Sequence, residues 1–169
     1  MPPLFEDVAE LVPLHQEPGT GDSRTLRLAS PPVDDAQLEA LLRYQRAYLA
    51  HAEPRRAAGP LAAAVITEAH GAGLAASGLD VKAVERGSAL LRAFAGKRWT
   101  LQRVRTRYAQ LQREQTPRAA EQRARVEEEL ARLESLQELE QRHGSELVSR
   151  LLAREAELVE LHTRLGALL

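Results

Sequence analysis

The chain has 169 residues, of which 44% are hydrophobic, 28% are charged and only 4% are aromatic, and its net charge is -1. A near-neutral chain has no whole-molecule field that would draw it to nucleic acid or to an anionic membrane. The lack of cysteine excludes a disulfide framework, a thiol nucleophile and a thiolate metal site. Its many alanine, leucine, arginine and glutamate residues favour helices, and its length suits one domain.

Residues 1–33 are expected to form a mostly irregular, flexible N-terminal arm. The stretch 15–33 is rich in proline, glycine and serine, which is typical of a linker. Ahead of it, Leu4, Val8 and Leu11 recur at helical spacing and predict a short amphipathic segment. Two helical turns are too short to be stable in water, so this segment is expected to be ordered only where it docks on another surface.

Neither a secretory signal nor a membrane span is expected. The first residues lack the basic and apolar regions of a signal peptide, which favours a cytoplasmic location. The most apolar window, residues 59–79, is mostly alanine and glycine and contains Glu68 and His70. Such a window predicts a closely packed helix of a folded domain rather than a helix in a bilayer.

Two short helices are predicted after the arm. The first is predicted over residues 34–51, because Asp34 is a good N-cap and the step before Pro54 disfavours further helix. The second is predicted over residues 60–76, because proline suits the first helical position and Gly78 suits a C-cap.

A longer helix is predicted to follow Asp80, a second good N-cap. Apolar residues at heptad spacing form a seam along it: Leu90, Phe94, Leu101, Val104, Tyr108 and Leu111. Thr116 and Pro117 have the pattern of an N-cap followed by proline at the first helical position, so a new helix is predicted there. Leucines continue along that helix to Gly144, which either ends it or bends it, and they recur at coiled-coil spacing beyond that glycine.

The sign of the charge reverses between these two helices. Residues 86–125 hold 11 basic and 2 acidic side chains, whereas residues 126–169 hold 5 basic and 10 acidic ones. If the chain doubles back at Thr116, a cationic helix lies antiparallel to an anionic one. Each exposed ion pair contributes only about 0 to 1 kcal/mol, so the pairs would select the register while the buried leucines supply the stability.

We therefore predict an all-α fold over residues 34–169. It is a helical bundle with a long antiparallel coiled-coil hairpin, and the flexible N-terminal arm precedes it. The hairpin is expected to bring Lys97, Arg98, Arg103 and Arg105 close to the glutamates at 127–129 and 134. Trp99 falls near the face opposite the hairpin seam, so it either packs under the two short helices or anchors a partner.

No enzyme, metal site or cofactor is expected. Glu140 and His143 form the one Glu-x-x-His pair in the chain, and a dinuclear carboxylate site in a helical bundle needs two such pairs. No glycine-rich loop joins a strand to a helix, and no serine lies in a nucleophile-elbow pattern. The recognisable chemistry of catalysis is therefore missing from the sequence.

The favoured hypothesis is a non-enzymatic protein-interaction module, such as an adaptor, a scaffold or a chaperone-like protein. It would bind a protein partner, or a second copy of itself as a homo-oligomer, through exposed apolar stripes. The last helical stretch has no predicted neighbour of matching length within the chain. The candidate partner-binding residues are Leu4, Val8, Leu11, Trp99, Leu151, Leu158, Leu161, Leu165 and Leu168.

Two alternatives stay open. The first is a nucleic-acid-binding helical protein that uses the basic segment 86–125, because arginines with interspersed aromatic residues suit phosphate contacts and base stacking. Its candidate polyanion-binding residues are Arg98, Arg103, Arg105, Arg107, Arg113 and Arg118. The second is a bundle that senses a small molecule in a cavity among the small residues Ala63, Ala64, Gly87 and Gly96.

Overall fold

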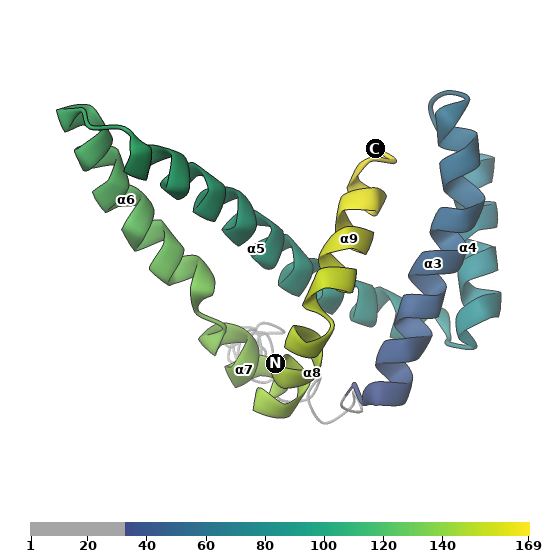
Figure 1. Cartoon of the computed structure of the whole chain (residues 1–169). Helices are drawn as coiled ribbons and strands as arrows, with labels where there is room; N and C mark the ends of the chain where they lie inside the picture. The colour runs from purple at the N-terminus through teal and green to yellow at the C-terminus, as the bar shows by residue number, and fades with distance from the viewer. Residues whose placement is uncertain (1–32) are drawn as a thin grey trace, which may run out of the picture. The chain divides into compact units, whose positions relative to one another are not determined.

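A computed structural model describes residues 33–169, and the predicted segment with Leu4, Val8 and Leu11 lies outside the described residues. Within the described range the backbone forms helices and no strands, so this part of the chain is all-α, as predicted (Figure 1). The helices are α3 (Asp35–Ala57), α4 (Ala63–Ser77), α5 (Val81–Arg113), α6 (Pro117–Glu134), α7 (Gln137–His143), α8 (Ser145–Ala153) and α9 (Glu155–Gly166).

The three longest of these helices begin where the sequence predicts. Asp34, Asp80 and Thr116 each accept a hydrogen bond from the backbone N–H three residues later, at 2.8, 2.7 and 3.1 Å. These bonds satisfy donors that the first turn of a helix leaves unpaired, and such a cap contributes about 1 kcal/mol. Gly78, with φ of 69°, also ends α4 as predicted.

Two predicted boundaries are wrong. Pro54 lies inside α3, which continues to Ala57 instead of ending near residue 51. A proline inside a helix removes the hydrogen bond that its own N–H would donate and crowds the carbonyl group four residues earlier. Only three residues of α3 follow Pro54, and the fully buried Ala52 packs the preceding turn. Helix α4 begins at Ala63 rather than at residue 60, since no side chain caps its start and proline alone does not determine the first turn.

Small residues let neighbouring helices approach closely. A Cβ atom at Gly73 of α4 would lie 2.5 Å from the ring of Tyr44 on α3, and one at Gly87 of α5 would overlap the side chain of Leu41. The cavity predicted among the small residues is therefore wrong in its location. Leu41 fills the space at Gly87, and the ring of His162 lies 3.5 Å from the position of a Cβ atom at Gly96.

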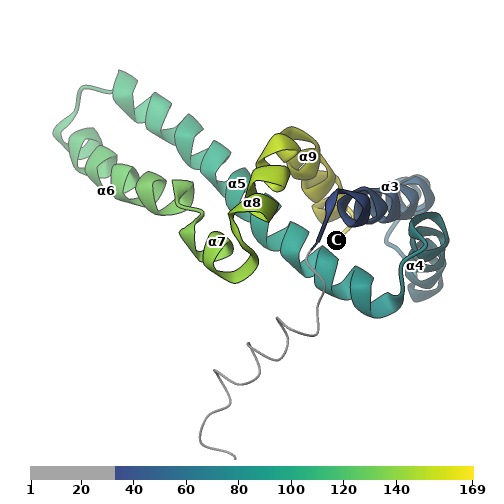
Figure 2. The same cartoon turned by 90° about the horizontal axis from the view of Figure 1, so that it is seen from below.

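The C-terminal stretch breaks more often than predicted. Besides Gly144, whose φ of 89° favours glycine, the helix is interrupted at Ser135–Leu136 and at Arg154. At these breaks the chain turns back, and α9 packs against both α5 and α3 (Figures 1 and 2).

The main core joins α3, α5, α8 and α9. Its buried residues are Leu38, Leu41, Leu42, Leu49, Leu90, Leu91, Phe94, Ala95, Leu147, Leu151, Leu158 and Leu161. The prediction of an exposed apolar stripe on the last helical stretch is therefore wrong. Leu151, Leu158 and Leu161 are at most 3% exposed, and the partly buried Leu165 and Leu168 pack against the same core. The stripe has an intrachain partner because α8 and α9 fold back.

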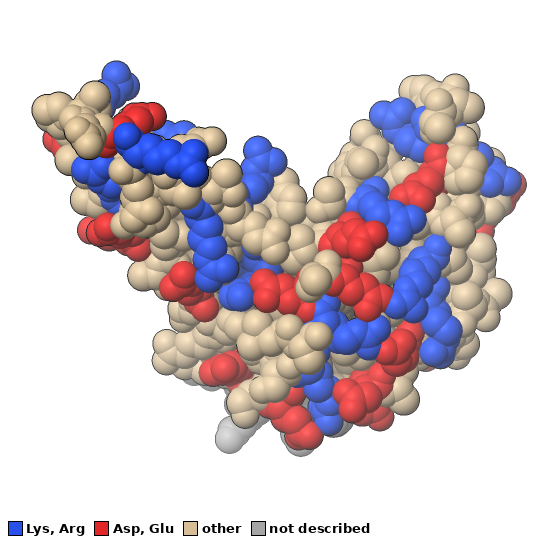
Figure 3. Space-filling model, in the orientation of Figure 1, with Lys and Arg blue, Asp and Glu red and all other residues tan. Residues whose placement is uncertain are grey.

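Three ion pairs join α3 to α9. Arg154, directly before α9, pairs with Glu39, and Glu157 pairs with Arg46. Arg164 pairs with Glu53, with Nε to Oε1 at 2.7 Å and Nη2 to Oε2 at 2.8 Å. The hydrogen bond from the guanidinium group holds the pKa of each of these two α3 carboxyl groups, Glu39 and Glu53, below its ordinary value. Figure 3 shows the resulting mixture of acidic and basic side chains on this face.

Helices α5 and α6 run side by side in opposite directions from the turn at Thr116 (Figure 1). A second, smaller core lies between them, with Leu111, Ala119 and Val126 buried and Val104, Tyr108 and Leu130 partly buried. Leu90 and Phe94, predicted for the hairpin seam, belong to the main core instead. The chain thus doubles back at residues 114–116, ahead of the change from basic to acidic sequence at residue 126, whereas coiled-coil packing along the hairpin remains a prediction.

Candidate functional site

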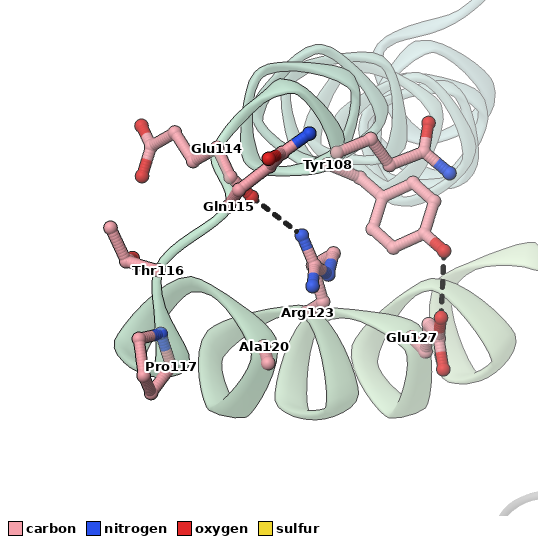
Figure 4. Close-up of a pocket in the computed structure, with 9 residues that line it drawn as sticks. Tyr108, Glu114, Gln115, Thr116, Pro117, Ala120, Arg123 and Glu127 are labelled. Carbon is pink, nitrogen blue, oxygen red and sulfur yellow. Dashed lines mark hydrogen bonds between the residues drawn. The ribbon is translucent and has the colours of Figure 1, made fainter.

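The tip of the α5–α6 hairpin is the first candidate site. We define the tip as residues 107–125, which hold five arginines and two glutamates and so carry a net charge of +3. The end of α5, the turn at residues 114–116 and the start of α6 form it. An open pocket of about 720 Å³ lies in the tip, lined by residues of both helices and of the turn (Figure 4).

Arg123 holds the turn in place. Its Nη1 atom donates hydrogen bonds to the carbonyl oxygens of Leu111 and Glu114, both at 2.9 Å. Figure 4 shows the bond to Glu114. The last carbonyl groups of a helix lack partners within the helix and carry partial negative charge, so a guanidinium group stabilises them. Arg123 therefore connects α6 to the end of α5, and we assign it to the structure of the tip rather than to a partner.

Tyr108 and Glu127 form the inner wall of the tip pocket. The Tyr108 hydroxyl donates a 2.6 Å hydrogen bond to Glu127 Oε1 (Figure 4). This bond raises the pKa of Tyr108, because the phenol must keep its proton to donate and an ionised phenol would face a carboxylate. The pair thus links the two helices just below the turn.

Further down the hairpin, the basic side chains have partners within the chain. Arg105 pairs with Glu134 at 3.2 Å, and the Lys97 ammonium group donates to the Ser135 carbonyl oxygen, so both reach the region predicted for them. The prediction for Arg98 is wrong. It pairs with Glu155 at 2.6 Å and its side chain is only 11% exposed, because α9 folds back onto α5.

Arg103 also departs from its predicted partner. Its guanidinium carbon lies 4.7 Å from the centre of the Trp99 ring. Trp99 is half-buried, and His162 of α9 meets its ring edge to face with a centroid distance of 6.4 Å. The prediction that Trp99 packs under the two short helices is therefore wrong. The folded-back α9 is its neighbour, so Trp99 is part of the α5–α9 contact.

Four arginines at the tip differ from those below it. Arg107, Arg113, Arg118 and Arg125, which we call the tip arginines, are all exposed. None of the four forms an ion pair with any residue in the range 33–169. Arg107, Arg113 and Arg118 are among the polyanion-binding residues predicted from the sequence, and Arg125 belongs to the same basic bend.

The second candidate site is a groove that the sequence did not predict. The central groove has a volume of about 960 Å³, and side chains of α3, α4, α5 and α9 line it together with the α3–α4 loop and the last residues of the chain. Its walls are largely apolar, with contributions from Ile66, Val84, Leu91, Leu165 and Leu168.

Hydrogen bonds satisfy two polar side chains of the groove. The Tyr44 hydroxyl and His70 Nδ1 lie 2.6 Å apart, so α3 and α4 are bonded across the wall that they share. Burial raises the pKa of Tyr44. His162, on the opposite wall, contacts Trp99. Another polar side chain, Gln45, is buried at the groove, and a polar residue within the apolar stripe of α3 was the one sequence signal for it.

Comparison with known proteins finds no matching family model, no similar curated protein and no similar solved structure. None of the helices that the structure describes is long and apolar enough to cross a membrane. Among residues 33–169, no three histidine or acidic side chains gather as they would around a metal ion. Any function must therefore be argued from the two sites themselves.

Proposed function

We propose that the protein is a non-enzymatic helical interaction module that binds an acidic protein surface with the tip of its α5–α6 hairpin. One observation carries this proposal. The four tip arginines are exposed and have no ion-pair partner within residues 33–169, while Arg98, Arg103 and Arg105 of the same basic segment are engaged. Arg98 and Arg105 are thus neutralised and Arg103 is stacked along the hairpin, whereas the tip arginines are available at its end.

The tip suits carboxylate recognition. A guanidinium group presents planar donors that match a carboxylate in two parallel hydrogen bonds. The turn that carries the arginines is held by the Thr116 cap and by Arg123. Little backbone conformational entropy is therefore lost when a partner binds. Each exposed ion pair is weak, so several must act together, and their field would mainly accelerate association.

An acidic protein fits the tip better than nucleic acid does. Two of the predicted polyanion-binding residues, Arg98 and Arg105, are already paired with glutamates. Trp99 contacts Arg103 and His162, so it does not offer a free ring on which a base could stack. Glu114 and Glu121 also lie within the tip, where they would oppose a continuous row of phosphates.

Self-association remains a prediction. Its basis was the exposed leucine stripe beyond Gly144, and that stripe is buried within the chain. A second copy could still present acidic residues to the tip, since residues 126–169 carry twice as many acidic as basic side chains. Sedimentation equilibrium over a range of salt concentrations would detect such an association as a mass that falls when salt is added.

Two double variants with the same change in net charge test the proposal. Arg113→Gln/Arg118→Gln alters the tip, and Arg132→Gln/Arg142→Gln alters arginines on α6 and α7 that pair within their own helices. Fluorescence anisotropy at low salt would compare binding of a labelled glutamate-rich peptide and of a single-stranded RNA. We expect the tip variant to bind the peptide about fivefold to tenfold more weakly, as for two exposed ion pairs, and the control variant to bind as the parent does.

Three results would count against the proposal. Tighter binding of RNA than of the peptide, lost in the tip variant, would assign the tip to nucleic acid. Equal losses in both double variants would mean that net charge alone attracts the peptide. Absence of binding to either probe at low salt would remove the tip as an anion-binding surface.

A further inference from the structure

The carboxamide of Gln45 has no protein partner in the central groove. Gln45 is only 7% exposed, on the buried face of α3 between Leu41 and Leu49. No hydrogen bond links its side chain to another residue in the range 33–169. A carboxamide has two donor hydrogens and an acceptor oxygen, and no residue of the described chain pairs with those of Gln45.

The carboxamide faces the groove rather than a sealed interior. Every side-chain nitrogen or oxygen that is closed off from solvent in the described part of the chain has a hydrogen-bond partner. Gln45 has none, so its polar atoms must retain access to the space that its side chain lines, which is the central groove. Its polar neighbours Tyr44 and His70 do not compete for it, because they bond to each other.

The groove has the composition of a small-molecule site. Binding sites for small molecules are concave, of about 300 to 1,000 Å³, mostly apolar, and carry a few polar groups that orient the ligand. The central groove has about 960 Å³, walls of aliphatic and tyrosine side chains, and the single unpaired carboxamide of Gln45 in its buried part. Leucine at position 45 would complete the apolar stripe of α3, so the packing of the helix does not require a glutamine.

The charge around Gln45 selects the kind of polar group that it would bind. Arg56, Glu85 and Arg92 line the groove, but Glu85 and Arg92 are exposed and Arg56 is half-exposed, so these charges lie near water. A carboxylate buried at Gln45 would have no cation beside it, and one neutral amide does not offset the cost of burying a charge. A neutral group that both donates and accepts a hydrogen bond has no such cost.

We infer that the central groove binds an elongated apolar small molecule that carries a neutral carboxamide or hydroxyl group, which pairs with the Gln45 carboxamide. The apolar body of the ligand lies against the aliphatic walls, and its polar group forms hydrogen bonds with the carboxamide of Gln45. This site lies apart from the hairpin tip in sequence and in lining residues, so it does not depend on the function proposed for the tip.

Three compounds of equal chain length test the inference on the full chain: decanamide, 1-decanol and decanoate. Binding is measured by thermal unfolding and by NMR of the glutamine side-chain NH2 groups. The Gln45→Leu variant identifies the signal of Gln45, and Gln102→Leu makes the same chemical change at an exposed position of α5 outside the groove. We expect decanamide to raise the unfolding temperature and to shift the Gln45 signal. Gln45→Leu should weaken its binding about fivefold to tenfold, the effect of one neutral hydrogen bond, while Gln102→Leu should not weaken it.

Other outcomes overturn the inference. Equal affinity of the parent and of Gln45→Leu for decanamide would make the groove a purely apolar site. Decanoate binding more tightly than decanamide would show that the arginines near the opening select the ligand. Binding of an amphipathic leucine-rich helical peptide in place of all three compounds would assign the groove to a protein helix. If Gln45→Leu does not fold, Gln45→Met removes the same hydrogen bonds with an unbranched side chain.

Discussion

Gly87 of α5 and Gly71 of α4 provide a sharp test of the packing, because the same substitution should have opposite effects at the two positions. Alanine at either position should stabilise the helix by about 1 kcal/mol, since glycine is the poorer helix former. At Gly71 a Cβ atom would meet nothing within 4 Å, so the full helix stabilisation should appear in the free energy of unfolding. At Gly87 the Cβ atom would lie 2.5 Å from Leu41 Cδ1, whereas carbon atoms prefer about 3.5 to 4.0 Å.

Leu41 is only 1% exposed and is surrounded by the main core, so it has little room to move away from a new methyl group. Overpacking of this kind costs about 1 to 3 kcal/mol. We therefore expect Gly87→Ala to lower the free energy of unfolding by up to about 2 kcal/mol, after the helix gain is subtracted, and Gly71→Ala to raise it by about 1 kcal/mol. Urea denaturation followed by circular dichroism measures both values. Equal stabilisation by the two substitutions would refute the close approach of α3 and α5.

Two further predictions concern the folded-back helices. Leu151→Ala should cost about 2 to 5 kcal/mol of unfolding free energy, because its side chain is fully buried, whereas Leu152→Ala, at a position 38% exposed, should cost far less. Similar losses for the two would mean that the stripe beyond Gly144 is not part of the core. The pKa values of Glu39 and Glu53 are lowered from 4.5 in the folded state by hydrogen bonds from arginines beside or within α9. The contribution of these two carboxylates to the stability of the folded protein is fully present above their unfolded pKa. It is lost as the pH falls through their folded pKa values. The urea midpoint should thus fall as the pH is lowered below the unfolded pKa, and should fall less in Glu39→Gln/Glu53→Gln.

The positions of the helix starts could be predicted because their causes are local. Asp34, Asp80 and Thr116 each bond to a backbone N–H three residues away, and no distant contact is needed for that. The all-α class follows from composition and periodicity. The reversal at Thr116 follows from a cap, a proline and two runs of opposite charge that lie close together along the chain.

The ends of helices were harder to predict. Pro54 disfavours helix locally, yet α3 continues for three residues past it, and the buried Ala52 packs the turn before it. The breaks at Ser135–Leu136 and Arg154 coincide with no glycine or proline. They occur where the chain leaves α6 and then turns back onto α5 and α3, so their cause is the packing of the segments that follow.

Local sequence signals specify where each long helix starts, that the described chain is helical, and that it reverses direction at Thr116. Which helix faces are buried depends on tertiary packing. An apolar stripe has the same sequence pattern whether its partner is another protein or another part of the same chain. The folding back of α8 and α9 buried Leu151 and Leu158, brought Trp99 against His162, paired Arg98 with Glu155 and placed Gln45 beside a groove. Each of these outcomes depends on contacts between residues far apart in the chain, and local hydrogen bonds and helix propensities do not specify them.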